Sequence, residues 1–198
     1  MPLGAVHFVC YSAILLIIMI KLKQVSYEDV IEFFTKEHPI DLESPHFAGN
    51  KWGRLHLDQA NKELGGLWAL CELEVDDILS LVIPFHAAEQ GDSILVEESG
   101  LVVIGAIDKL KNSLPEYAEK NPVCWAKIMY WKEKDFSPLF LSTAPATQGR
   151  RSHTDPSLGT LFHLDGLHRL MRWGMDGRFE SENYAKGPKL TAYVAGFK

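Results

Sequence analysis

Residues 159–173 read GTLFHLDGLHRLMRW, and the expected fold follows mainly from this segment. An apolar run typical of a strand ends at Asp165-Gly166, and a helical pattern begins at Leu167. His168 and Arg169 fall in the first turn of that helix, where unpaired backbone N–H groups and the helix dipole favour an anion. The stretch therefore predicts a strand, a turn and a helix that together hold a phosphate group.

The rest of the C-terminal half is rich in expected strands. The pattern predicts strands over residues 123–131, 138–141 and 190–194, and a loop over 142–157 where proline and glycine lie among small polar residues. A mixed sheet is the expected result.

The N-terminal half reads as mainly helical. Ser26 is a good N-cap for a helix that stops at His38-Pro39, and residues 39–54 read as a loop. A short helix over 57–64 should end at Gly65-Gly66. The remaining expected elements are a strand over 67–75, a helix over 76–82 that ends near Pro84, a hairpin of 93–96 with 101–104, and a helix over 106–120 that Pro115 breaks.

The size and composition suit one folded unit. The chain has 198 residues, of which 46% are hydrophobic, and five tryptophans supply core material. We expect residues 23–198 to form a single α+β domain with a helical N-terminal part and a mixed-sheet C-terminal part. Residues 1–22 stand apart as an apolar N-terminal segment.

The net charge of −6 argues against broad binding to nucleic acid or to an anionic membrane, because such proteins present a basic face. Positive charge is nevertheless concentrated between residues 148 and 178, where five arginines stand near three acids. This local excess predicts a small anionic ligand as the partner. The arginines are Arg150, Arg151, Arg169, Arg172 and Arg178.

The three cysteines, Cys10, Cys71 and Cys124, are widely spaced and form no CxxC pair. Neither a disulfide framework nor a zinc knuckle is indicated, so we expect small, half-buried apolar residues in a reducing cytoplasm.

The N-terminus leaves three alternatives open. Residues 5–20 are mostly apolar and are followed by Lys21 and Lys23, a run that is short for a bilayer span of about 20 residues. One alternative is a weak membrane anchor with the domain held in the cytoplasm. A second is that translation starts at Met19, and a third is a cleaved signal.

Three segments together carry a resemblance to a known fold. They are residues 137–142, the stretch 159–170 with its Asp165-Gly166-x-His168-Arg169 turn, and residues 190–194. This series is similar to the closing half of the ParB/sulfiredoxin-like fold, whose members include partition proteins that bind CTP, sulfiredoxins and free-serine kinases. The resemblance covers residues 123–198 and implies that a nucleotide phosphate is held at the turn. Leu167 stands where the catalytic cysteine of sulfiredoxins would precede His168.

The leading hypothesis is a nucleotide or another phosphorylated small molecule bound at the Asp165 to Arg169 turn, in the manner of a small-molecule phosphotransferase. Gly166 allows a tight turn, and the guanidinium of Arg169 offers two parallel hydrogen bonds to phosphate. His168 and Asp165 are the expected catalytic groups. The expected cofactor is a nucleoside triphosphate or diphosphate with Mg²⁺. Further ligand-binding side chains are expected at Arg172, Arg150 and Arg151.

A second hypothesis is a metal-dependent enzyme that uses His163, Asp165 and His168. His163 and Asp165 lie two apart on a strand and so share a face, and His168 follows within reach. A more distant ligand could come from one of two pairs, His86 with Glu89 or His153 with Asp155.

A third hypothesis is a non-catalytic binding protein or a biosynthetic accessory protein. In that case Asp165 only caps the helix, and substitution of Arg169 costs stability without abolishing a ligand response.

Overall fold

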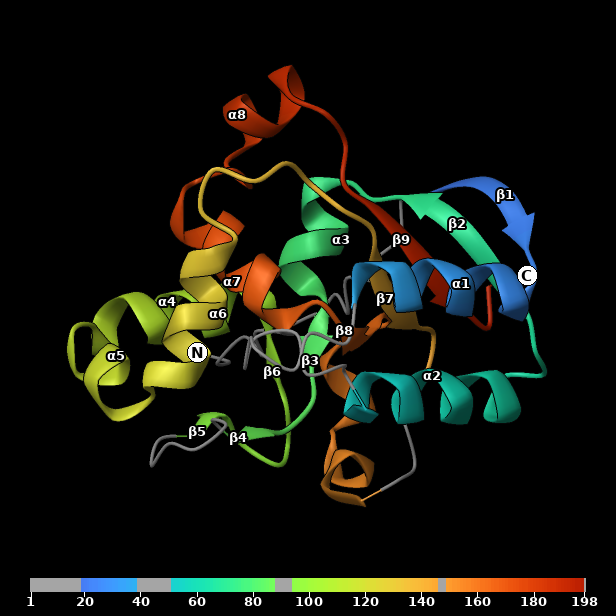
Figure 1. Cartoon of the computed structure of the whole chain (residues 1–198), viewed down its shortest axis with the longest axis horizontal. Helices are drawn as coiled ribbons and strands as arrows, with labels where there is room; N and C mark the ends of the chain where they lie inside the picture. The colour runs from blue at the N-terminus through green and yellow to red at the C-terminus, as the bar shows by residue number, and fades with distance from the viewer. Residues whose placement is uncertain (1–18, 39–50, 88–93, 146–148, 198) are drawn as a thin grey trace, which may run out of the picture.

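The computed structural model describes residues 19–38, 51–87, 94–145 and 149–197, and it has a mixed α+β architecture (Figure 1). A sheet of seven strands runs in the order β1-β2-β9-β7-β8-β3-β6. Neighbouring strands are antiparallel except for two parallel pairs, β9 with β7 and β8 with β3. The strands are β1 (Ile20–Val25), β2 (Trp68–Glu72), β9 (Thr191–Ala195), β7 (Leu139–Ser142), β8 (Phe162–Asp165), β3 (Val82–Ile83) and β6 (Leu101–Val102).

Helices cover both faces of this sheet. Trp68 of β2 and Phe140 of β7 pack in one cluster with α1 (Tyr27–Glu37) and α2 (Lys51–Glu63). Their neighbours Ala69 and Leu141 belong to a larger cluster on the other side, as the alternation of side chains along a strand requires. The helices that contribute to the larger cluster are α3 (Val75–Ser80), α4 (Val103–Ser113), α5 (Glu116–Lys120), α6 (Pro122–Tyr130), α7 (Leu167–Met175) and α8 (Ser181–Lys186).

Smaller elements complete the described chain. The short strands β4 (His86–Ala87) and β5 (Ile94–Val96) pair with each other in a separate ribbon. Two 3₁₀-helices, η1 (Gly149–His153) and η2 (Pro156–Leu158), occupy the stretch that the sequence predicts as a loop.

Several expected elements are confirmed with their local causes. The Ser26 side chain accepts a hydrogen bond from the backbone N–H of Asp29, and Asp29 reaches back to cap α1. Gly65 and Gly66, both with φ of 71°, follow the end of α2, although that helix begins at Lys51 and is longer than expected. Pro115 separates α4 from α5 as predicted.

The expected strand over residues 123–131 is wrong, because this segment is helix α6. Pro122 occupies the first helical position, where its missing N–H costs nothing. Cys124 and Ile128, four residues apart, are the buried positions, which is a helical spacing. A short apolar run does not by itself distinguish a buried helix from a buried strand.

The expected hairpin is also wrong in its pairing. Residues 94–96 form β5 and pair with β4, whereas residues 101–102 form β6 and pair with β3. Residues 103–104 begin helix α4, and Val82, expected in a helix, lies in β3. The sheet also takes β1 and β2 from the N-terminal part, so that part is less purely helical than predicted.

The alternatives for the N-terminus concern residues that lie mostly outside the described part of the chain, which begins at residue 19. Among the described residues, no helix combines the length and the apolar character needed to cross a bilayer.

Candidate functional site

The strand, turn and helix predicted around residue 165 are present as β8, Gly166 and α7. Gly166 has a φ of 108°, and a Cβ atom there would meet Arg169 Nε and Leu139 Cδ2 at 2.7 Å each. The turn therefore requires glycine at position 166. The atoms that leave no room for a Cβ there belong to protein side chains, those of Arg169 and Leu139.

Arg169 lies at the centre of a group of charged and polar side chains, of which Asp165 and Arg169 are buried. We name this group the ion-pair network: Glu37, His38, Ser137, Asp165 and Arg169. Its Nη1 donates to Ser137 Oγ at 2.6 Å and to Glu37 Oε2 at 3.3 Å. Its Nη2 lies 3.4 Å from Asp165 Oδ2, which is also 3.3 Å from His38 Nε2. Because Glu37 and His38 end α1, the network fastens that helix to the start of α7.

The electrostatics of the network are those of mutually stabilised charges. Burial alone would raise the pKa of Asp165, but the hydrogen bond and charge of His38, with the charge of Arg169, bring that pKa below its ordinary value. Burial opposes the charged form of His38 as well, yet Asp165 raises the pKa of His38 above its ordinary value. Arg169 is 2% exposed. A phosphate at this turn would have to compete with Glu37 and Asp165 for its guanidinium.

The other arginines that were expected to bind the phosphate make different contacts in the structure. Arg172 pairs with Asp176 through a hydrogen bond of 2.9 Å. Arg151 lies in η1 and donates from Nη1 to the carbonyl oxygen of His163 at 2.8 Å. Arg150 is also in η1, and its side chain is outside the described part of the structure. The nucleotide site, with its Mg²⁺, therefore stays a prediction.

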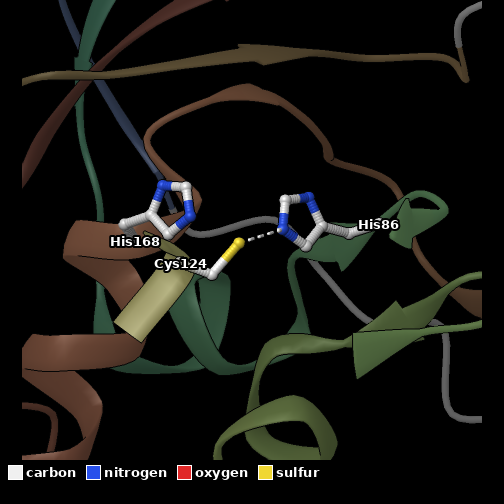
Figure 2. Close-up of side chains that lie close together, drawn as sticks. All are labelled: His86, Cys124 and His168. Atoms are coloured by element: carbon white, nitrogen blue, oxygen red, sulfur yellow. Dashed lines mark hydrogen bonds between the residues drawn. The ribbon is translucent and has the colours of Figure 1, made fainter. Parts of the chain in front are cut away.

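His168, the residue beside Arg169, belongs to a different group. Its ring lies with the side chains of His86 and Cys124, and one donor atom from each of the three lies within 4.8 Å of the others. Cys124 Sγ is 4.0 Å from His86 Nε2, and the two imidazole rings meet edge to face with centroids 5.7 Å apart. Figure 2 shows the three side chains pointing toward one another. We name them the His–Cys–His cluster.

Three separate elements position this cluster. His168 is in the first turn of α7, Cys124 in the first turn of α6, and His86 in β4 (Figure 1). Helices α6 and α7 pack against each other. Cys124 is fully buried, and the Tyr117 side chain is hydrogen-bonded to it. Burial, together with Cys124, raises the pKa of Tyr117.

The donor set fits a thiophilic divalent metal. Thiolate sulfur and imidazole nitrogen are the ligands that zinc prefers in proteins. Neighbouring donors of a tetrahedral zinc site lie about 3.3–3.6 Å apart. The donors here lie within 4.8 Å of one another, so metal binding would require the widest pair to close by at most about 1.5 Å. Within the described residues the cluster offers three donor atoms, one fewer than a tetrahedral zinc ion takes.

Of the predicted metal triad, only His168 lies in this cluster. Asp165 belongs to the ion-pair network, and His163 is a buried residue of β8 outside the group of close donors. His86, expected from the sequence as a possible distant ligand, does lie in the cluster, whereas its companion Glu89 lies outside the described residues. The other pair is occupied differently, since His153 contacts Glu98 and Asp155 caps η2.

A third set of polar side chains lies around His163. Both ring nitrogens of His163 are buried without a hydrogen-bond partner among the described residues. Burial and the positive charge of Arg151 lower the pKa of His163 well below its ordinary value. The same two causes lower the pKa of His56 to about 4. Neither His56 nor the pairing of Arg151 with His163 was expected from the sequence.

The chain belongs to the family described as "Family of unknown function (DUF6309)", which matches residues 19–198. No curated protein and no solved structure matches the chain. The resemblance to the ParB/sulfiredoxin-like fold accordingly stays a prediction.

Proposed function

We propose that this protein is a zinc-dependent enzyme whose metal is held by His86, Cys124 and His168. The observation that carries the proposal is the convergence of two imidazoles and one thiol, from three elements far apart in the sequence, to within 4.8 Å. The contact between α6 and α7 and the ribbon of β4 with β5 bring these three side chains together.

The three donors that the described residues supply are the number that a catalytic zinc centre takes from the protein. Structural zinc sites are closed by four protein ligands, whereas catalytic sites keep three and leave a position for water or substrate. Zinc lowers the pKa of water in that position to about 7 and polarises a bound carbonyl or phosphoryl oxygen. Hydrolysis or addition of water to a small substrate is the chemistry that such a centre supports.

Tyr117 supports the assignment from outside the ligand set. Ligating groups in metal sites are commonly oriented by hydrogen bonds from neighbouring residues. A hydroxyl that donates to Cys124 stabilises the thiolate, which is the form that binds metal. Tyr117 is therefore a positioning residue in this proposal.

The test is the metal content of purified full-length protein. We expect about one zinc per chain in the wild type and loss of zinc in Cys124→Ser and in His86→Asn. The matched control is His153→Asn, since His153 is a more exposed histidine paired with Glu98. Substitution with Co²⁺ should give a thiolate-to-cobalt charge-transfer band that Cys124→Ser abolishes.

Two outcomes overturn the proposal. One is wild-type protein that takes up neither zinc nor cobalt after exposure to either metal. The other is full retention of zinc and of the charge-transfer band in Cys124→Ser, which would place the metal elsewhere.

The predicted nucleotide or phosphorylated ligand remains a second candidate function. The observation that favours an anionic ligand is Arg151, which lies near the buried histidine His163.

A further inference from the structure

Two helices begin at the His–Cys–His cluster. Cys124 lies in the first turn of α6 and His168 in the first turn of α7, and each of these helices has nine residues. The Cα–Cβ bonds of a helix tilt toward its N-terminus, so the side chains of a first turn lie at that end. Figure 2 shows the two side chains pointing toward one another. The cluster therefore lies at the N-terminal ends of two helices that pack together.

Neither helix is capped by the side chain of its N-cap residue. The N-cap of α6 is Asn121, but its Nδ2 donates to the carbonyl oxygen of Tyr117 at 3.1 Å and its side chain makes no cap hydrogen bond. The N-cap of α7 is Gly166, which has no side chain to offer. Backbone hydrogen bonds along the helices begin at Trp125 in α6 and at Leu170 in α7. The N–H groups that precede these residues, with the positive ends of both helix dipoles, favour an anion.

The donor set of the cluster favours the same sign of charge. Among the described residues, the group of close donors includes two histidines and a cysteine but no carboxylate. Two neutral imidazoles and one thiolate leave a divalent zinc ion with an excess positive charge. Cys124 is fully buried, and a buried charge without compensation is costly. A monoanion bound as a further ligand offsets that charge.

A buried histidine on the same side of the sheet also lacks a partner. His163 of β8 lies opposite Leu141 of β7, and Leu141 packs in the larger core cluster to which α6 and α7 contribute. Residues directly opposite in an antiparallel pair face the same side of a sheet, so His163 faces the side of these helices. Both of its ring nitrogens are buried without a hydrogen-bond partner among the described residues. Because buried polar atoms are almost always hydrogen-bonded, His163 calls for a further polar group on this side.

We propose that the zinc centre takes a small oxyanion, a carboxylate or a phosphate, as its substrate, and that the N-terminal ends of α6 and α7 stabilise the charge of that anion. Catalytic zinc can expand to five ligands during a reaction, so the anion and the reacting water can share the metal. The metal in this assignment rests on the proposed function. The attraction of the two helix starts for an anion does not.

The experiment is a titration of the cobalt-loaded full-length protein, at constant ionic strength, followed by the cobalt absorption bands. Acetate and inorganic phosphate are the two anionic probes, and acetamide is the neutral counterpart of acetate with nearly the same shape. We expect at least one anion to shift the bands with one molecule bound per chain, and acetamide to leave them unchanged at the same concentration. The anion that responds identifies the class. Bands that respond to neither anion, or that respond equally to acetate and acetamide, overturn the proposal.

A pair of variants separates the helix starts from the charge of the metal itself. Pro122 is exposed at the first position of α6, so Pro122→Glu places a carboxylate at this helix start, and Pro122→Gln is its neutral control of the same size. We expect the anion to bind about threefold or more weakly to Pro122→Glu than to Pro122→Gln, because the new carboxylate occupies the same positive end. Both variants should keep the cobalt spectrum measured without anion. Equal affinities would show that the helix starts play no part.

The failure of this proposal can be told from failure of the zinc centre. A cobalt spectrum that depends on Cys124 but responds to neither anion overturns the anion alone. If the protein takes up no metal, the proposed function is overturned, and calorimetry on the metal-free protein tests the helix starts. Anion binding that is weaker in Pro122→Glu than in Pro122→Gln would then retain the anion site, and equal or absent binding would overturn it as well.

Discussion

His168 and Arg169 are consecutive residues of α7, yet they serve two regions of different character. Arg169 enters the ion-pair network, in which its guanidinium contacts Glu37, Ser137 and Asp165. His168 joins a cluster whose members are all metal-ligating types with one donor atom each directed inward. Two adjacent polar residues at the start of one helix can therefore belong to different groups, one a set of ion pairs that joins α1 to α7 and the other a set of potential metal ligands.

Removing the central charge of the ion-pair network should give the largest effect. Arg169→Met keeps an unbranched side chain of similar length but removes a charged partner of the buried Asp165 carboxylate. We expect the free energy of unfolding to fall by about 3–5 kcal/mol, because an uncompensated buried charge is costly. Urea unfolding measures this loss.

The control for this variant is Arg172→Met, which breaks a more exposed pair with Asp176 and should cost about 1 kcal/mol or less. Zinc content should be unchanged in both variants. If Arg169→Met has wild-type stability but no longer binds a phosphate compound that the wild type binds, the guanidinium of Arg169 serves ligand binding and not the fold. The Asp165 to Arg169 turn would then be the anion site.

The strand, turn and helix that carry His168 and Arg169 could be predicted from the sequence. The end of β8, the left-handed glycine and the beginning of α7 are all determined within residues 159–173, because turn and capping signals act over a few positions. Which charges surround Arg169 could not be predicted in this way. Glu37 precedes it by 132 positions, and only the packing of α1 brings the two together.

The His–Cys–His cluster was missed for a related reason. Cys124 lies in an apolar segment that the pattern assigns to a strand, and a strand there would direct its side chain differently from helix α6. A lone cysteine without a CxxC partner gives no local metal signal. Its ligands come from three elements whose meeting depends on the whole fold.

The pH dependence of stability should also distinguish the polar regions. His56 and His163 have lowered pKa values, so below the ordinary value of 6.5 the unfolded chain binds protons that the folded chain does not. Stability should therefore fall as pH decreases from 6.5 toward 4. His38 acts oppositely, because its pKa is raised: its contribution is complete below 6.5 and is lost as pH rises through the folded-state pKa.

Two variants measure these opposite slopes by urea unfolding at several pH values. His56→Gln should flatten the loss of stability between pH 6.5 and 4, and His38→Gln should cost more stability at pH 6 than at pH 9. His153→Gln, at a more exposed position, serves as the control. Parallel curves for His56→Gln and wild type would mean that the imidazole of His56 is not held neutral in the fold.

The smallest expected effect concerns the hydroxyl that adjoins Cys124. Tyr117→Phe removes the hydrogen bond to Cys124 and keeps the buried ring, so the fold should be preserved while the thiolate loses a stabilising partner. We expect zinc affinity to fall about tenfold, at the lower end for such neighbours of a ligand, and the loss to shrink as rising pH favours the thiolate in both proteins. Competition with a chromophoric chelator at two pH values measures both effects. Equal affinities at both pH values would show that Tyr117 only packs against Cys124, and a stability loss without a change in affinity would place this hydroxyl with the structural polar groups.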